Sequence, residues 1–206
     1  MKFCSNCGTA VELKIPEGDN RERYVCPACH TIHYVNPKIV AGCLVTAGEQ
    51  VLLCKRAIEP RKGYWTLPAG FMENGESAED GAARETWEEA LAKVDIHGLY
   101  TVFSLPYISQ VYMFYRGTLV GTQFGAGPES LEVGLYDEAD IPWNDLAFPV
   151  VTQTLRHYFE DRKTGIFPTR SAVLKWKRRT VSTPDSAKDS PADGAETNAP
   201  ANAAAR

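Results

Sequence analysis

Three glutamates near the middle of the chain have the spacing of a metal-binding helix face. Glu85, Glu88 and Glu89 fall within about a 100° arc if successive residues turn by roughly 100° around a helix. Like charges three or four residues apart destabilise an exposed helix by about a few tenths of a kcal/mol per pair, so this face needs a cation. Arg84 and Lys93 are candidates, but carboxylates at this density favour Mg²⁺ or Mn²⁺. A merely solvated acidic face is the alternative.

The N-terminal cysteines have the spacing of a structural zinc site. Two Cys-x2-Cys pairs are separated by eighteen residues, which lies inside the range typical of such sites. Four thiolates complete a tetrahedral shell without an open position, so the metal would stabilise the fold rather than perform chemistry. Two redox-active pairs are the alternative, which is disfavoured because no thioredoxin-like pattern surrounds them. The predicted zinc ligands are Cys4, Cys7, Cys26 and Cys29.

The remaining metal-binding residue types have less distinctive surroundings. His30 and His33 lie close to Cys29 and could serve as ligands, but four cysteines already saturate the metal, so we expect both to be bystanders. Cys43 and Cys54 fall in short apolar runs, where a thiol behaves as a small buried hydrophobic group.

The elements that must position these side chains form an α/β pattern. One helix is expected after Ser77, because Ser77 with Asp80 three residues later is typical of a helix start. A second helix is expected from about residue 147 to 162, where apolar residues recur at helical spacing. Strands are predicted at about 39–45, 51–54, 95–103, 108–119 and 131–136.

Composition divides the chain into three regions. Residues 1–36 have too little apolar periodicity to fold without a bound metal ion. Residues 37–179 contain the predicted sheet and helices. Residues 180–206 hold hardly any large apolar side chains, so we predict a disordered tail. The stretch 170–179 is basic and could bind a phosphate or a polynucleotide, although a solvated surface is favoured.

Charge and hydropathy limit the classes of partner. The formal net charge of −4 argues against a protein built mainly to bind nucleic acid. No stretch reaches the roughly 18 consecutive apolar residues of a membrane span, and the N-terminus lacks the apolar core of a signal peptide. We therefore expect a cytoplasmic protein without a membrane partner. The sequence leaves a homodimer open.

The segment from Gly70 to Ala92 resembles the Nudix box, Gly-x5-Glu-x7-Arg-Glu-U-x-Glu-Glu-x-Gly-U, in which U is aliphatic. Three positions depart from this pattern: Thr86 replaces an aliphatic residue, Leu91 replaces the closing glycine, and Ala92 is a small final residue. These departures leave the expected metal ligands intact and bear on the backbone where the helix ends. The matching residues are Gly70, Glu76, Arg84, Glu85, Glu88 and Glu89.

The resemblance implies a Nudix α/β/α sandwich with a mixed sheet, preceded by a small zinc ribbon. It implies that Glu85, Glu88 and Glu89 hold the divalent ions, with help from the Gly70 carbonyl, and that Glu76 pairs with Arg84.

The positions of individual residues in the sequence suggest roles in proton transfer and substrate binding. The proton of the attacking water would pass to Glu88 or to a loop carboxylate, for which Glu132 is the candidate. Arg56 would contact a phosphate and Trp65 would stack on a base, as Tyr107 and Tyr112 also could. An exposed strand-edge glutamate, an ordinary surface arginine and buried core aromatics are the respective alternatives.

The resemblance also bears on the substrate. Segments 67–73, 127–132 and 141–148 are similar to plant chloroplast FAD pyrophosphatases and their bacterial relatives, which implies hydrolysis of FAD or ADP-ribose, a small-molecule nucleotide substrate. NADH pyrophosphatase or NAD-cap RNA decapping activity is the alternative, disfavoured because 104–112 lacks the Ser-Gln-Pro-Trp-Pro-Phe-Pro motif of NADH-hydrolysing relatives. A nucleic-acid-binding ribbon on an inactive scaffold is a further alternative, although nucleic acid is not the favoured partner.

Overall fold

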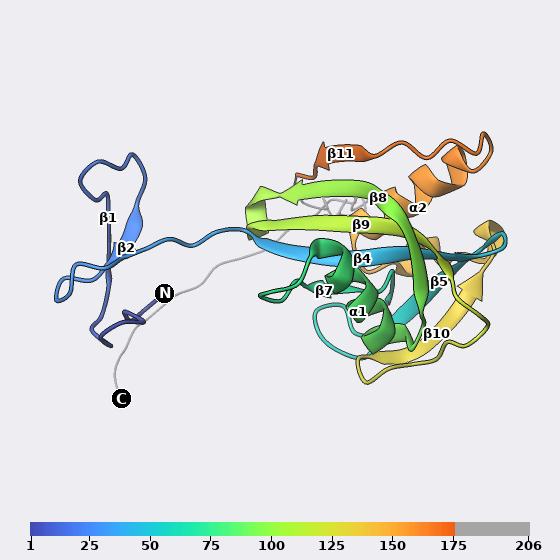
Figure 1. The fold of residues 1–206 in the computed structure, drawn as a ribbon, viewed down its shortest axis with the longest axis horizontal. Helices are drawn as coiled ribbons and strands as arrows, with labels where there is room; N and C mark the ends of the chain where they lie inside the picture. The colour runs from blue at the N-terminus through green and yellow to red at the C-terminus, as the bar shows by residue number, and fades with distance from the viewer. Residues whose placement is uncertain (176–206) are drawn as a thin grey trace, which may run out of the picture. The chain divides into compact units, whose positions relative to one another are not determined.

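The computed structural model describes residues 1–175, which form a small N-terminal sheet and a larger α/β body (Figure 1). The tail predicted from residue 180 and the last basic residues, 177–179, lie outside the described residues. No helix within the described part of the chain is long and apolar enough to cross a membrane.

The N-terminal unit is a three-stranded antiparallel sheet. Its strands are β1 (Glu12–Lys14), β2 (Arg23–Val25) and β3 (Ile32–His33), in the order β1-β2-β3. One cysteine-bearing turn precedes β1 and the other connects β2 to β3, and each brings its two thiols close to those of the other turn. The small size of this sheet agrees with the prediction that a metal must stabilise the unit.

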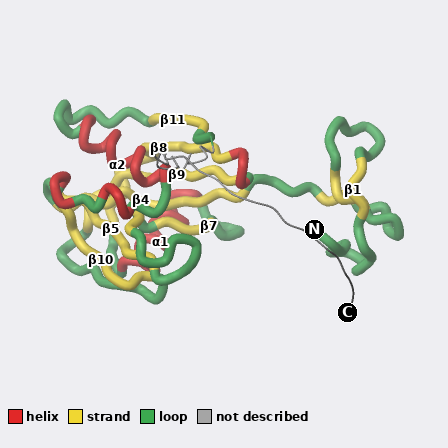
Figure 2. Tube along the Cα trace, turned by 180° about the vertical axis from the view of Figure 1, so that it is seen from behind, coloured by secondary structure: helices red, strands yellow, loops and turns green. Residues whose placement is uncertain are grey.

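The body is built on a mixed sheet of eight strands. The order along the main path is β10-β5-β4-β9-β8-β11, while β6 pairs with β5 and β7 pairs with β4 (Figures 1 and 2). β4 runs parallel to β9, β11 runs parallel to β8, and the other pairs are antiparallel. The strands are β4 (Lys38–Ala47), β5 (Gln50–Arg56), β6 (Trp65–Thr66), β7 (Ala69–Phe71), β8 (Val94–Leu105), β9 (Gln110–Leu119), β10 (Ser130–Tyr136) and β11 (Arg170–Val173).

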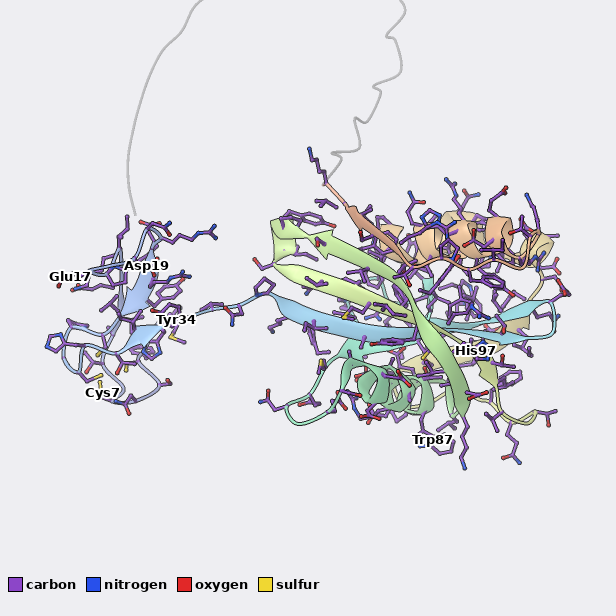
Figure 3. All side chains as sticks on the ribbon, turned by 45° about the horizontal axis from the view of Figure 1, so that its top comes forward. Cys7, Glu17, Asp19, Tyr34, Trp87 and His97 are labelled. Atoms are coloured by element: carbon purple, nitrogen blue, oxygen red, sulfur yellow. The ribbon has the colours of Figure 1, made fainter. Side chains whose placement is uncertain are left out.

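A helix covers each face of the sheet. The helices α1 (Ala78–Ala90) and α2 (Pro149–Asp161) lie on opposite sides (Figure 3). Alternate residues of β4 enter different cores, because Leu44 packs with α2 whereas Cys43 and Val45 pack with α1. This arrangement confirms the α/β fold class, with the sheet between two helical layers.

The predicted helices and long strands are present with shifted ends. Three short 3-10 helices, η1 (Pro106–Ile108), η2 (Glu138–Asp140) and η3 (Trp143–Asp145), accompany them, and the strand expected from 108 begins at Gln110. The two-residue and three-residue strands β6 and β7 take the place of the single strand over 64–70 that the Nudix resemblance implies as the lead into the box. Both are too short to show an alternating apolar pattern.

The sequence did not predict the C-terminal strand β11. Its Arg170 forms an ion pair with the buried carboxylate of Asp161, the last residue of α2. The hydroxyl of Tyr100, on β8, donates to the same carboxylate at 2.6 Å. Arg170 therefore ties the edge strand to α2, and its role differs from the phosphate contact considered for the basic stretch.

Candidate active site and metal centre

The helix α1 presents the acidic face predicted from its sequence. Ser77 caps its N-terminus, and the Ser77 hydroxyl accepts from the Asp80 N–H at 3.1 Å. Glu79 and Asp80 lie in the first turn, where the helix dipole favours negative charge, but the last turn holds no basic residue. Glu85, Glu88 and Glu89 follow in the less favourable half of the helix.

Arg84 and Glu76 form the predicted pair that holds the preceding loop against α1. The guanidinium donates to both Glu76 carboxylate oxygens, at 3.0 and 2.8 Å, and to the Phe71 carbonyl at 3.1 Å. Its remaining N–H groups reach Glu85 at 2.7 Å and Glu88 at 2.9 Å. Arginine has five N–H donors, so this residue is saturated and is a structural clamp rather than a substrate contact. The bonds from Arg84 lower the pKa of Glu76 to about 2.

Burial distinguishes the three predicted metal ligands. Glu88 is half-exposed, with 54% of its side chain accessible, whereas Glu89 is buried at 5%. Desolvation raises the pKa of Glu89 to about 7, although its carboxylate accepts from the Ala69 N–H at 3.1 Å. Desolvation also raises the pKa of Glu85. Two carboxyl groups are therefore held away from water, where a cation would compensate their charge.

Gly70, the first residue of the box, lies directly against one of the predicted ligands, Glu85. A Cβ on Gly70 would lie 2.3 Å from the Glu85 carboxylate, so a larger residue here would displace the Glu85 side chain from its position. β7 also positions Ala69, which bonds Glu89. Among the described residues, however, only the four cysteines have ligand atoms that all lie within 4.8 Å of one another. The carboxylates thus share a site without converging on one point.

These residues line a cavity of about 1080 Å³ beside α1. This volume is near the upper end of ordinary ligand sites. Its lining includes six glutamates, at 59, 73, 85, 88, 89 and 129, against two arginines, at 56 and 84, a formal excess of four negative charges. Aromatic and apolar residues form much of the remaining wall, among them Phe71, Tyr107, Ile108, Tyr112, Phe114 and Phe148.

The loop carboxylate in this cavity is Glu129, not Glu132. Glu132 does not line the cavity, is more than half-exposed, and pairs with Lys55 at 3.7 Å. Glu129 lines the cavity, and its charge contributes to the raised pKa values of Glu85 and Glu89. The predicted glutamate thus lies three residues from the one that lines the cavity, and the β10–β5 register is irregular between Ser130 and Glu132.

The residues predicted to contact the substrate do not all line the cavity. Arg56 lines the cavity, where its Nε donates to the Pro60 carbonyl at 2.9 Å and its guanidinium lies over the Phe148 ring. Trp65 does not line the cavity: it is 8% exposed and packs edge-on against Tyr136 in the core. Tyr107 and Tyr112 do line it. Trp65 is therefore corrected to a core residue, the alternative considered for it.

The departures from the box pattern are accommodated locally. Thr86 is fully buried, and its hydroxyl donates to the Ala82 carbonyl at 2.8 Å, so it occupies an aliphatic position without an unsatisfied group. Leu91 adopts the left-handed conformation, with φ of 47°, and its N–H bonds the Trp87 carbonyl at 2.8 Å. The helix therefore ends with the turn that glycine would favour, at some cost in strain.

The four N-terminal cysteines form the second candidate metal site. Their sulfur atoms lie within 4.8 Å of one another, with Cys4–Cys29 at 3.6 Å and Cys7–Cys26 at 3.4 Å. Figure 3 shows the sulfurs gathered around the labelled Cys7. A tetrahedral shell with zinc–sulfur bonds of about 2.3 Å needs sulfur separations of about 3.8 Å, so the thiols present fit zinc.

Comparisons with known proteins identify a family for each part of the chain. Residues 2–35 match the Nudix N-terminal zinc ribbon and residues 36–161 match the NUDIX domain. A NUDIX hydrolase from Nitrosomonas europaea, known from its crystal structure, is 56% identical, with a TM-score of 0.82. The match covers 84% of this chain and 99% of that one.

Two curated relatives carry more specific names. The NAD-capped RNA hydrolase NudC of Stutzerimonas stutzeri is 33% identical over 137 residues, which cover 64% of this chain and 46% of the relative. The ADP-ribose pyrophosphatase of Methanocaldococcus jannaschii is 29% identical over 116 residues, which cover 53% of this chain and 67% of the relative. The chain thus matches less than half the length of the first relative.

Proposed function

This chain belongs to the Nudix hydrolase family, and we propose that it hydrolyses the pyrophosphate bond of nucleotide conjugates that contain an ADP moiety. The observation that carries this proposal is the opening of the α1 carboxylates into a large cavity with aromatic walls. An acidic floor suits the metal-bound pyrophosphate, and aromatic walls suit the flat rings of a nucleotide.

The charge of the cavity argues for more than one divalent ion. A pyrophosphate diester brings two further negative charges to a lining with a formal excess of four, so binding without cations would be strongly opposed. Bound Mg²⁺ or Mn²⁺ would neutralise the phosphates and make a bound water more acidic. Glu85, Glu88, Glu89 and Glu129 are the side chains that would hold these ions, with the Gly70 carbonyl as a further ligand.

The protein's own groups have distinct tasks in this proposal. Glu88 or Glu129 takes the proton from the attacking water, because both carboxylates line the cavity. Arg56 contacts a phosphate, since the other cavity arginine, Arg84, already uses all its donors. Tyr107 and Tyr112 flank the bases of the bound nucleotide substrate.

The substrate is best assigned within the ADP-containing class. The relatives' names favour ADP-ribose and NAD over FAD, the substrate expected from the sequence, because neither name mentions a flavin. All three substrates would release AMP. NAD-capped RNA is the second candidate, favoured by the name of the Stutzerimonas stutzeri relative.

The substrate test compares kcat/KM for ADP-ribose, NAD, NADH, FAD and NAD-capped RNA with Mg²⁺ and with Mn²⁺. This ratio measures discrimination between substrates. We expect ADP-ribose or an NAD derivative to give the highest value. The products to be measured are AMP from the four small compounds, and NMN with 5′-monophosphate RNA from the capped RNA. Failure to cleave any of the compounds with either metal ion would overturn the proposed function, whereas a clear preference for FAD would overturn only the substrate order.

A matched pair of variants tests the assignment of the loop carboxylate. Glu129→Gln should lower kcat by about 10²- to 10⁴-fold, because the variant loses a metal ligand or a proton acceptor. Glu132→Gln, three residues along the same segment and outside the cavity, should keep near wild-type kcat. Equal losses in the two variants, or full activity of Glu129→Gln, would contradict the assignment.

A further inference from the structure

The two cysteine turns of the ribbon repeat the same structure. The sequences Cys4-x2-Cys7-Gly8-Thr9 and Cys26-x2-Cys29-His30-Thr31 share the pattern Cys-x2-Cys-x-Thr. In each turn the first cysteine N–H bonds the threonine carbonyl, at 2.8 Å for Cys4 and 3.0 Å for Cys26. Gly8 and His30 occupy equivalent left-handed positions, with φ of 75° and 59°.

The side-chain contacts of the sulfurs partly follow the same symmetry. The hydroxyl of Thr9 lies 3.4 Å from the Cys7 sulfur, and the hydroxyl of Thr31 lies 3.1 Å from the Cys29 sulfur. Once a cysteine is a metal-bound thiolate it has no proton, so the hydroxyl must donate in each pair. Each threonine hydroxyl thus donates a hydrogen bond to the second cysteine of its own turn.

His33 breaks this symmetry on the buried side of the site. Its Nε2 lies 3.3 Å from the Cys4 sulfur, and the two residues are 8% and 3% exposed. Its strand β3 pairs with β2 through the Tyr24–His33 register, which fixes the position of the ring. Both buried sulfurs receive a backbone N–H, from Asn6 to Cys4 at 3.4 Å and from Cys29 to Cys26 at 3.5 Å, so the imidazole is an additional contact on the Cys4 side. His33 is therefore in contact with a ligand atom, unlike the bystander role expected from the sequence.

We propose that His33 is a positioning residue of the zinc centre, which donates its Nε2–H to the Cys4 thiolate. Four thiolates around Zn²⁺ carry a formal net charge of −2, and each hydrogen bond to sulfur offsets part of that charge. Cys4 is shielded from solvent, so water cannot supply a further bond beside that of the Asn6 N–H, and the imidazole supplies it. The same contact fixes the Cys4 side chain in the orientation that the tetrahedral shell requires.

The experiment measures zinc affinity of the full-length protein by competition with a chromogenic chelator. His33→Ala should weaken zinc binding by about 10- to 100-fold, the range found when such supporting contacts are lost. His33→Gln keeps an N–H donor of similar reach and should recover most of the affinity. His30→Asn is the matched control, because asparagine tolerates the left-handed conformation, and its affinity should equal that of the wild type.

Spectra of the Co²⁺-substituted protein separate the hydrogen bond from packing. Loss of an N–H donor to sulfur makes the thiolate a stronger electron donor, so the sulfur-to-cobalt charge-transfer bands of His33→Ala should move to lower energy. The bands of His33→Gln and His30→Asn should stay near the wild-type positions. Wild-type affinity in His33→Ala, or an equal loss in His33→Gln and His33→Ala with unmoved bands, would overturn the proposal. These outcomes are independent of the hydrolase activity.

Discussion

Replacing Glu89 by glutamine should stabilise the protein in the absence of Mg²⁺ while abolishing its activity. Glu89 is buried, and desolvation raises its pKa from 4.5 to about 7. A shift of this size corresponds to about 3 kcal/mol, which the folded state must supply to ionise the group at high pH. Glutamine keeps an oxygen that can accept from the Ala69 N–H and carries no charge.

The sign of the pH dependence follows from proton binding. The folded state holds the Glu89 proton up to about pH 7, whereas the unfolded chain releases it near pH 4.5, so the wild-type stability falls as pH rises between these values. The advantage of Glu89→Gln should therefore grow from about 1 kcal/mol at pH 5 to about 3 kcal/mol at pH 8.

Urea unfolding of both proteins at several pH values measures this difference. Mg²⁺ is omitted and no chelator is added, so the ribbon keeps its zinc while the carboxylate site is free of added cation. Glu88→Gln is the matched control: this side chain is half-exposed, so the same substitution should not produce the pH-dependent gain. The reasoning fails if Glu89→Gln is no more stable than the wild type at pH 8, or if its advantage does not change with pH.

Further expected outcomes concern other parts of the molecule. Metal analysis of protein purified without chelator should find about one zinc per chain, and Cys26→Ser should unfold the ribbon while urea unfolding of the body is unchanged. Glu88→Gln should lower kcat by about 10²- to 10⁴-fold in an AMP-release assay. Arg170→Ala should destabilise the body to urea by about 3 kcal/mol, because it leaves the buried Asp161 carboxylate unpaired. Leu91→Gly should raise the thermal midpoint by relieving a left-handed strain of about 1 kcal/mol.

The sequence predicted the features that depend on residues close together in the chain. The Ser77 cap, the helical spacing of the three glutamates and the two cysteine turns each depend on residues close together in the chain, and the structure contains all three features. β11 depends instead on Arg170 meeting a carboxylate at the end of α2 and on pairing with β8. No pattern within residues 170–173 encodes these distant contacts.

Two of the predicted site residues, Trp65 and Glu132, lie outside the cavity. Trp65 precedes the box and has a ring suited to stacking, but its two-residue strand β6 pairs with β5 so that the indole faces the core instead of the cavity. Glu132 was chosen because it enters β10 from the glycine-rich turn and could face the box, but it lies outside the cavity and pairs with Lys55. Strand partners and bulges decide which face a side chain occupies, and a single sequence does not reveal them.

The glycine-rich turn before β10 connects the end of α1 to the cavity. In the sequence it predicts only a turn, but in the structure the Gly125 N–H bonds the Ala90 carbonyl at 2.8 Å and the Gly127 N–H bonds the Glu89 carbonyl at 3.1 Å. The turn thus caps the helix terminus. A Cβ on Gly127 would lie 1.7 Å from the Glu88 carbonyl oxygen, so any other residue would push the turn away from α1. Because Glu129 is two residues further along, the same close approach brings the loop carboxylate to the acidic face of α1. The proposed ligand set therefore depends on this glycine as well as on the glutamates of the box.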